Sequence, residues 1–326
     1  IGLCLVGSEM CIRDSNETVK RTKIKPLDLL DEVQLNEIRM KKNSMNILAL
    51  MFDWGLIILG FCLFYFFPST LSFFVSVVIV GSRQFALAVL AHDGAHHLLF
   101  SNSKTNDFVS QWFIAYPIFQ DNRVYRPYHL KHHRFTETAD DPDIGLSAPF
   151  PISKISFARK VIRDLTGITG YRRYSQAISS IIRTEANNPK ERFLKIWNKI
   201  HGFLITNIII FALVSFFFHW SLFLLLWWFP AFTYYSLIIR IRNIAEHSVT
   251  SGSSEMDNTR TTKASFLVRF LMAPHRVNFH LEHHLFMMCP WYNLPKAHKM
   301  MIENGYKDKM CLENSYTRVL LKAVSA

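Results

Sequence analysis

The stretch LSFFVSVVIVGSRQFALAVLAHDGAHH, residues 71–97, decides the fold. It begins with about twenty mostly apolar residues, a length that lets a helix cross a bilayer, and it continues directly into His92, His96 and His97. Other apolar runs are followed by HLKHH at 129–133, by His247 and by HLEHH at 280–284. Histidines grouped at the ends of membrane spans predict an integral membrane protein with a metal site at one membrane face.

Four apolar runs are long enough to span a membrane, and short turns at 68–70 and 219–221 join them in pairs. The runs cover residues 45–67, 71–90, 203–218 and 222–241. Spans joined by so short a turn must run antiparallel. We therefore expect an all-α membrane protein whose four transmembrane helices form two hairpins beneath a cytoplasmic helical cap that holds a two-metal site.

The distribution of positive charge orients these spans. Lys and Arg number 37 against 25 Asp and Glu, yet neither tight turn contains a Lys or Arg, whereas the other connections are rich in them. Because positive loops stay in the cytoplasm, we expect a multi-pass protein of a bacterial inner membrane with both termini and all histidine groups cytoplasmic. No zinc knuckle, basic helix or single-strand platform supports binding of nucleic acid.

The chain divides into three parts by composition. Residues 1–15, IGLCLVGSEMCIRDS, read as a translated sequencing artefact rather than native protein. Residues 16–44 form a cytoplasmic N-terminal segment, with a helix expected over 26–42 that carries Leu30, Val33 and Ile38 on its apolar face. Residues 45–326 form the membrane domain. Within it, 105–119 reads as an interfacial or re-entrant helix, and 151–200, with eleven Lys and Arg against three acids, as amphipathic helices on the membrane surface.

The spacing of the histidines indicates two metal ions. Histidines three or four residues apart lie on one face of a helix, and this spacing recurs in three groups. One structural zinc takes four ligands, so nine histidines exceed a single ion. The five cysteines form no CxxC pair, which argues against a cysteine-ligated zinc or iron–sulfur site. An all-nitrogen pair of metals open to lipid suits O2 activation better than hydrolysis.

HDGAHH, HLKHH and HLEHH resemble the three histidine boxes of the membrane fatty acid desaturase superfamily, and the similarity extends over residues 45–300. The surrounding RNIAEH and PWYNLPKAH match as well, while Met287-Met288 stands where many members have proline. The resemblance implies a non-haem di-iron centre, with Asn243 meeting one iron through water. The implied ligands are His92, His96, His129, His132, His133, His247, His280, His283 and His284.

Several neighbours of these histidines are candidates for holding a ligand in place, because a ligating imidazole commonly donates its second N–H to an acceptor. His97 is one, since adjacent imidazoles on a helix diverge by about 100° and His97 therefore cannot easily share the metal with His96. The carboxylates in this set are Asp93, Glu246 and Glu282, with Asp140, Asp141 and Asp143 after the second box. For Asp140, Asp141 and Asp143 an ordinary solvated role remains equally open.

Arg83 lies inside the second span, where a charge is a functional-site hypothesis by default. It is expected to contact a substrate head group or an acid such as Asp53; the alternative is that its side chain extends to the membrane surface.

The activity implied by the resemblance is desaturation of a fatty acyl chain with two iron ions, O2 as co-substrate and an external electron donor. The alternative is a hydroxylase or ketolase of the same superfamily that acts on an alkane, a carotenoid or another lipid. The chain lacks the HPGG signature of a fused cytochrome b5 and the cysteines of a fused ferredoxin. We therefore expect a separate ferredoxin or cytochrome b5-type donor, which the basic region 151–200 would bind unless that region binds anionic lipid.

Overall fold

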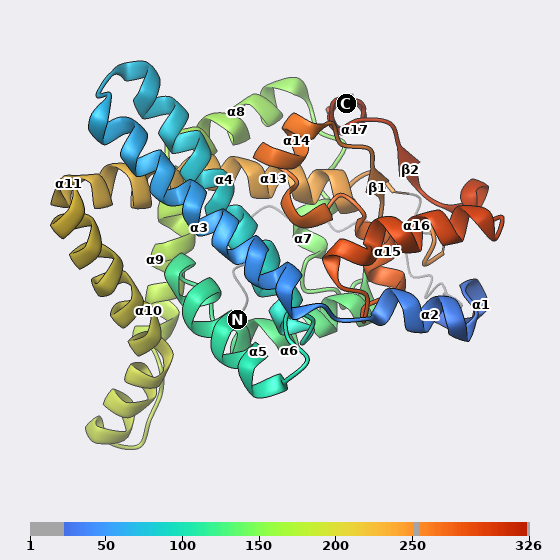
Figure 1. Cartoon of the computed structure of the whole chain (residues 1–326), viewed down its shortest axis with the longest axis horizontal. Coiled ribbons are helices and arrows are strands. Elements are labelled where there is room, and N and C mark those ends of the chain that lie inside the picture. Colours follow the sequence, from blue (N-terminus) through green and yellow to red (C-terminus); the bar gives the residue numbers. More distant parts are fainter. Residues whose placement is uncertain (1–22, 251–253, 325–326) are drawn as a thin grey trace.

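The computed structural model of the chain describes residues 23–250 and 254–324. The artefact expected in residues 1–15 lies outside the described residues. Regular structure in the described ranges is almost entirely helical, and four helices are long and apolar enough to cross a membrane. Figure 1 shows these long helices on one side of the molecule and a cap of short helices on the other. The predicted fold class is confirmed.

The first membrane hairpin consists of α3 (Asn43–Phe66) and α4 (Thr70–Ala95). The Ser69 hydroxyl accepts a hydrogen bond from the Ser72 backbone N–H and so caps the first turn of α4. In its most apolar stretch α4 is 67% buried, against 28% for α3. The inner helix of the pair is therefore α4, which continues beyond the expected span into the first histidine group.

The second hairpin joins α10 (Pro189–Phe217) to an irregular span over Trp220–His247. Both are longer than the runs expected from the sequence, because amphipathic turns extend them past the apolar core. The irregular span divides into α11 (Trp220–Leu222), the π-helix η3 (Phe223–Trp228), α12 (Phe229–Phe232) and α13 (Tyr234–His247). Its inner end, α13, delivers His247 to the cap.

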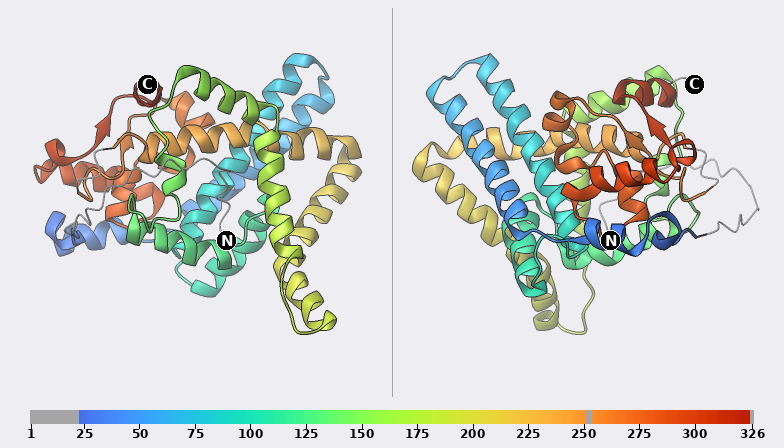
Figure 2. Two further views of the ribbon diagram at one scale, coloured as in Figure 1. Left: turned by 180° about the vertical axis from the view of Figure 1, so that it is seen from behind. Right: turned by 45° about the vertical axis from the view of Figure 1, so that its right-hand side comes forward.

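The segments between the hairpins are short helices outside the four candidate spans. The region expected to be an interfacial or re-entrant helix is divided into α5 (Ser103–Val109), the π-helix η1 (Ser110–Ala115) and η2 (Tyr116–Ile118). The basic region 151–200 covers α8 (Lys154–Leu165), α9 (Ile168–Ile182) and the first turns of α10. Figure 2 shows the end of α9 and the start of α10 projecting together from the body.

The cap is built from short elements around the second and third histidine groups. Its core includes Leu30, Ile38, Leu281 and Met301, all at most 1% exposed. The elements not yet bounded are α6 (Asn122–Phe135), α7 (Ile144–Ser147), β1 (Thr261–Thr262), α14 (Phe266–Leu271), η4 (Pro274–Arg276), α15 (His280–Leu285), η5 (Trp291–Asn293), α16 (Leu294–Glu303), η6 (Lys307–Lys309), β2 (Leu312–Glu313) and α17 (Tyr316–Ala323). The two strands pair in parallel.

The N-terminal segment differs from the single helix expected over 26–42. It forms α1 (Pro26–Leu29) and α2 (Glu32–Arg39), because Leu30 is extended and the Asp31 carboxylate caps the Gln34 N–H. Val33, placed on the apolar face by the sequence, is 78% exposed, while Leu35 is buried in the cap. The break at Asp31 rotates α2 and changes which residues face inward.

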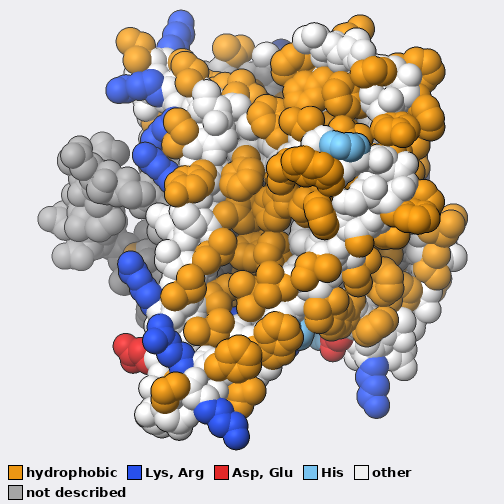
Figure 3. Space-filling view, turned by 90° about the vertical axis from the view of Figure 1, so that its left-hand side faces the viewer, with side chains coloured by type: hydrophobic (Ala, Val, Ile, Leu, Met, Phe, Trp, Pro, Cys, Tyr) orange, Lys and Arg blue, Asp and Glu red, His pale blue; other side chains and the backbone are white. Residues whose placement is uncertain are grey.

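Figure 3 views the membrane side of the molecule, where apolar side chains cover most of the surface. Exposed apolar area of this extent marks contact with lipid. Its members come from both hairpins and include Phe66, Phe67, Leu71, Phe74, Phe216, Phe217 and Trp220.

Candidate metal centre

Four helices bring all nine of the predicted ligand histidines together where the membrane helices meet the cap. The last residues of α4 and α13 enter from the membrane side; α6 packs against α4, and the histidine rings of α15 contact those of both α4 and α13. These helices carry His92 and His96 at the end of α4, His129, His132 and His133 on α6, His247 on α13, and His280, His283 and His284 on α15.

The imidazoles form two clusters, in each of which one ring nitrogen per residue lies within 4.8 Å of the others. We name them by their size. The five-histidine cluster consists of His92, His96, His129, His133 and His283, and the four-histidine cluster consists of His132, His247, His280 and His284.

The HxxHH spacing explains why each cap helix serves both clusters. On α6, His129 and His133 are four residues apart and share a face, so both enter the five-histidine cluster, while His132 points to the four-histidine cluster. On α15 the pattern repeats with the clusters exchanged, since only its middle histidine, His283, enters the five-histidine cluster. Both helices therefore bridge the two groups.

The nitrogen atoms in the clusters are arranged as metal ligands would be. Across the five-histidine cluster, His133 Nε2 lies 2.9 Å from both His129 Nε2 and His283 Nε2. His92 Nε2 and His96 Nε2 are buried and lack a hydrogen-bond partner among the described residues. Converging, unpartnered imidazole nitrogens are costly to bury, and a metal ion that accepts their lone pairs removes that cost. The residues present therefore fit two metal ions.

Burial keeps most of these imidazoles neutral, the state that binds a metal. It lowers the pKa of His96 to about 3, helped by the nearby Arg126 charge. Burial and the neighbouring histidines also lower the pKa of further ligand candidates in the cap. These are His129, His133, His280, His283 and His284.

His132 is the exception in the cap. Burial would lower its pKa, but the hydrogen bond to Asp141 and the charges of Asp143 and Asp141 outweigh burial and raise it. His132 Nδ1 lies 2.8 Å from Asp141 Oδ1 and 3.6 Å from Asp143 Oδ2. Asp141 is buried, whereas Asp140 is exposed. Of the three acids that follow the second box, Asp141 therefore fixes a ligand candidate and Asp140 is a solvated acid.

The acids beside the other boxes have different partners. Asp93 lies 3.2 Å from His92 Nδ1 and also accepts the backbone N–H of Trp291 at 3.0 Å. Glu246 accepts from Arg242 at 2.6 Å, and its second oxygen lies 3.4 Å from His280 Nε2. Both acids thus adjoin ligand candidates.

Glu282 lies on α15 but faces away from both clusters. It contacts His298 Nδ1 at 2.6 Å and accepts the Thr261 hydroxyl, so it ties α15 to α16 and to β1. His97 also lies outside the clusters. Its φ of 57° turns the chain, and its ring lies 3.2 Å from Asp107. A left-handed φ at a non-glycine residue redirects the side chain, which separates His97 from His96.

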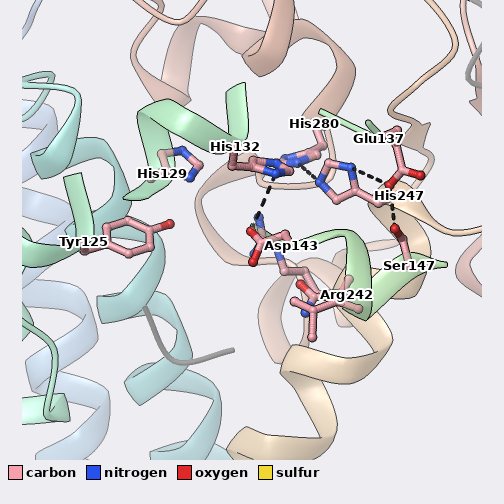
Figure 4. A pocket seen from close by; sticks show the side chains of 11 residues that line it. Tyr125, His129, His132, Glu137, Asp143, Ser147, Arg242, His247 and His280 are labelled. Atoms are coloured by element: carbon pink, nitrogen blue, oxygen red, sulfur yellow. Dashed lines mark hydrogen bonds and ion pairs between the residues drawn. The ribbon is translucent and has the colours of Figure 1, made fainter. Parts of the chain in front are cut away.

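A small cavity opens beside the four-histidine cluster (Figure 4). Asn243 lines it, as do Tyr125 and Arg242. The Tyr125 ring stacks on His129 with centroids 5.1 Å apart, and its hydroxyl is directed into the cavity. The remaining lining residues are His129, His132, Glu137, Asp143, Leu146, Ser147, His247 and His280. This cavity gives a ligand of a few atoms access to the histidines.

A second, smaller cavity lies among the membrane helices, and half of its eight lining residues are aromatic. Tyr235 lines it, and Arg242, two turns further along α13, lines the first cavity. Residues seven apart share a helix face, so both cavities adjoin the same side of α13. The other lining residues are Gln84, Pro117, Ile118, Tyr174, Trp227, Trp228 and Ala231.

Arg83 is held within the protein instead of extending to the membrane surface. It is 2% exposed and its Nη1 lies 3.0 Å from Asp53 Oδ1, the acid that the sequence suggested as a partner. The structure supports Asp53 as the partner of Arg83, and the alternative that the Arg83 side chain extends to the membrane surface is wrong. Among the described residues Arg83 lines neither cavity, so contact with a substrate head group stays an untested prediction.

Sequence reasoning missed several residues at the centre. Glu137 lies 4.0 Å from His247 Nδ1. Its spacing from the histidines in the sequence gave no signal, because the loop that follows α6 brings it to α13. His298 reaches Glu282 from a separate helix. Helical periodicity did contain two signals: Tyr125 precedes His129 by four residues, and Arg242 precedes Glu246 by four.

Comparison with known proteins finds two similarities. The family model described as fatty acid desaturase matches residues 68–310, a range that contains all nine histidines of the two clusters. Dihydrorhizobitoxine desaturase of Bradyrhizobium elkanii is 28% identical over 244 residues, which cover 71% of this chain and 68% of that protein.

Proposed function

This chain belongs to the fatty acid desaturase family and is a membrane-bound oxidoreductase, and we propose that it introduces a double bond into a fatty acyl chain. The two histidine clusters are the observation that carries the proposal, because each offers ring nitrogens within 4.8 Å of one another that could hold one metal ion. By family, those ions are iron. The nine histidines named above are the proposed ligands.

Two bound iron ions would supply the O2-dependent oxidation. The overall reaction balances as R–CH2–CH2–R′ + O2 + 2 e⁻ + 2 H⁺ → R–CH=CH–R′ + 2 H2O. One C–H bond breaks at each carbon, and O2 is reduced to water by four electrons, two from the substrate and two from the donor. A hydroxylase uses the same histidine ligands and the same two electrons from outside, but one oxygen atom of O2 stays on the product as a hydroxyl group.

The protein orients the ligands and excludes water. Asp141 holds the Nδ1 proton of His132, which leaves Nε2 directed at the four-histidine cluster. Asp93 plays the matching part for His92 in the five-histidine cluster. Both carboxylates are at most 4% exposed, so each ligand keeps one tautomer as the substrate enters.

The two cavities suggest how an apolar substrate reaches the centre. Its chain would enter at the partly aromatic cavity among the membrane helices, which has to widen to admit it, and would follow α13 toward the metal-side cavity, where Tyr125 and Asn243 lie beside the histidines. Entry from lipid in this way needs no passage through water.

Electrons would come from a separate acidic protein on the cytoplasmic side, the side on which we place both termini and the clusters. On α9, Arg172 is exposed, but Arg173 donates to the Ala231 carbonyl at 2.9 Å and stacks on Tyr174 and Tyr235. Arg172 is therefore the accessible partner of this pair, and Arg173 holds α9 against α12.

The test is a mass-spectrometric profile of a bacterial host that expresses the chain beside a His283→Ala control. New unsaturated acyl chains present only with the unaltered chain would support the proposal and locate the double bond. Hydroxylated products would replace it with the hydroxylase alternative. Because the relative is named for dihydrorhizobitoxine, the profile should cover soluble metabolites too. If no new product appears, the iron content of the purified protein is the next measurement. Protein without iron would have an unformed centre, whereas protein with iron would require a different substrate.

A further inference from the structure

A second group of buried charges lies outside the histidine clusters, between the first membrane hairpin and the cap. Asp53 on α3 is 0% exposed and uses both of its oxygens: Oδ1 lies 3.0 Å from Arg83 Nη1, and Oδ2 lies 2.7 Å from His275 Nε2. We name these three residues the Asp53 cluster. Charged groups inside a membrane protein are expensive and need partners, so their position here requires an explanation.

The Asp53 cluster receives a segment of the cap that descends to the membrane helices. Arg83 donates to the Phe270 carbonyl near the end of α14, and its guanidinium lies 4.8 Å from the Phe270 ring. Phe266 and Leu267 on the same helix are 75% and 62% exposed. Backbone carbonyls left free at membrane depth must find donors, and Arg83 provides one.

The chain after α14 is strained where it meets Asp53. His275 and Arg276 have φ values of 49° and 56°, in the left-handed region that non-glycine residues seldom occupy. Such backbone persists only when the surroundings hold it. The contact between Asp53 and His275 provides that hold, and α15 begins only five residues after His275, at His280.

The same segment contacts the first histidine box. The His275 ring packs on Trp291 with centroids 4.9 Å apart. The Trp291 backbone N–H donates to Asp93, which adjoins His92, and the Trp291 indole N–H donates to Asn46 on α3. The Asp53 cluster is therefore connected to the ligands at the end of α4 as well as to those on α15.

We propose that Asp53, Arg83 and His275 are positioning residues of the metal centre: they anchor residues 270–275 to the first hairpin and thereby hold α15 opposite α4 and α6. This inference rests on the proposed metal centre. In this role the three residues stabilise the fold around the metal centre and need not contact the substrate. Loss of the anchor would let α15 shift and would weaken metal binding while the hairpins remain folded.

The chain offers a matched control for this proposal. Asp164 on α8 is also 0% exposed and also pairs with an arginine, Arg240 on α13, at 2.5 and 2.8 Å. This pair holds α8 against α13 and contacts none of the nine histidines in the described part of the chain. Asp53→Asn and Asp164→Asn thus remove equivalent buried charges from two different interfaces.

The experiment measures Fe(II) affinity anaerobically by competition with a chelator, on full-length purified variants and well below their unfolding temperatures. We expect Asp53→Asn to lose about ten- to a hundredfold in affinity, the range found when groups that orient ligands are removed. Asp164→Asn should lower the unfolding temperature but retain the affinity of the unaltered protein. Equal affinities of the two variants would overturn the proposal.

A second pair keeps the test decisive if Asp53→Asn fails to fold. His275→Gln retains a donor that can reach Asp53, whereas His275→Ala removes it. Iron affinity should be largely rescued in His275→Gln relative to His275→Ala, and equal losses in both would contradict the anchoring role. Absence of iron binding by the unaltered protein would instead remove the proposed metal centre, and the inference with it.

Discussion

Nδ1 of His132 and Oδ1 of Asp141 lie 2.8 Å apart in a buried contact that fixes which nitrogen of His132 faces the four-histidine cluster. Asp141→Asn should lower metal affinity about 10- to 100-fold, because the amide holds the imidazole proton less strongly than a carboxylate does. Chelator competition measures the change. Asp140→Asn, one residue earlier and exposed, is the control. Equal affinities of the two variants would show that Asp141 does not orient a ligand.

The adjacent residues His96 and His97 should differ sharply on substitution. His96→Ala removes a donor from the five-histidine cluster and should reduce bound iron by about one ion per chain, abolishing activity. His97→Ala loses the ring contacts with Asn106 and Asp107, which lie outside both clusters, and its iron content should match that of the unaltered protein. Metal analysis of the purified proteins measures both, and a loss of iron in His97→Ala would place it among the ligands.

Local periodicity predicted much of the centre but not the division of its ligands. The i, i+4 spacing was enough to place His129 and His133 on one face of a helix. That His132 joins His247 depends on how α6 packs against α13, which is a long-range relationship. The hairpins followed from length and polarity alone, because a bilayer imposes both.

Where sequence reasoning went wrong, one local bond was responsible. The Asp31 cap divides the N-terminal helix, so Val33 is exposed and Leu35 is buried. The Arg83–Asp53 pair could be predicted because few acids lie within the spans. The approach of His275 could not, since more than 200 residues separate it from Asp53.

The metal-free protein should lose stability on acidification. Burial lowers the pKa of six histidines outside the spans, so they stay neutral when folded but take up protons when unfolded, below about pH 6.5. The unfolded state then binds more protons, and stability falls by about 1.4 kcal/mol per histidine for each pH unit. The six are His96, His129, His133, His280, His283 and His284.

His132 acts in the opposite sense, because its pKa is raised. Its contribution is fully present below about pH 6.5 and is lost as pH rises through its folded-state pKa. One such group does not offset six. The unfolding temperature of metal-free protein should therefore fall between about pH 7.5 and pH 5.5. An unfolding temperature that stays constant or rises as the pH is lowered over this range would show that the histidines of the clusters are not buried and neutral.

Gly170 allows α9 to approach α12 closely. A Cβ at this position would lie 2.4 Å from the Phe232 carbonyl oxygen, which is backbone and cannot rotate away. Gly170→Ala should cost about 1–3 kcal/mol of unfolding free energy, seen as a lower unfolding temperature. Gly55→Ala in α3, where a Cβ meets nothing within 4 Å, should not destabilise. Equal stability of the two variants would contradict this packing.

Arg172 and Arg173 separate docking of the electron donor from packing of the fold. Arg172→Glu reverses an exposed charge, and it should slow turnover by the donor most at low salt, because salt screens the attraction. Arg173→Glu breaks the bond to the Ala231 carbonyl and should lower the unfolding temperature at every salt concentration. Turnover at two ionic strengths and thermal unfolding measure the two effects. If Arg172→Glu leaves turnover unchanged at low salt, the electron donor binds elsewhere. Binding of anionic lipid would then be the remaining role for the basic face of α9.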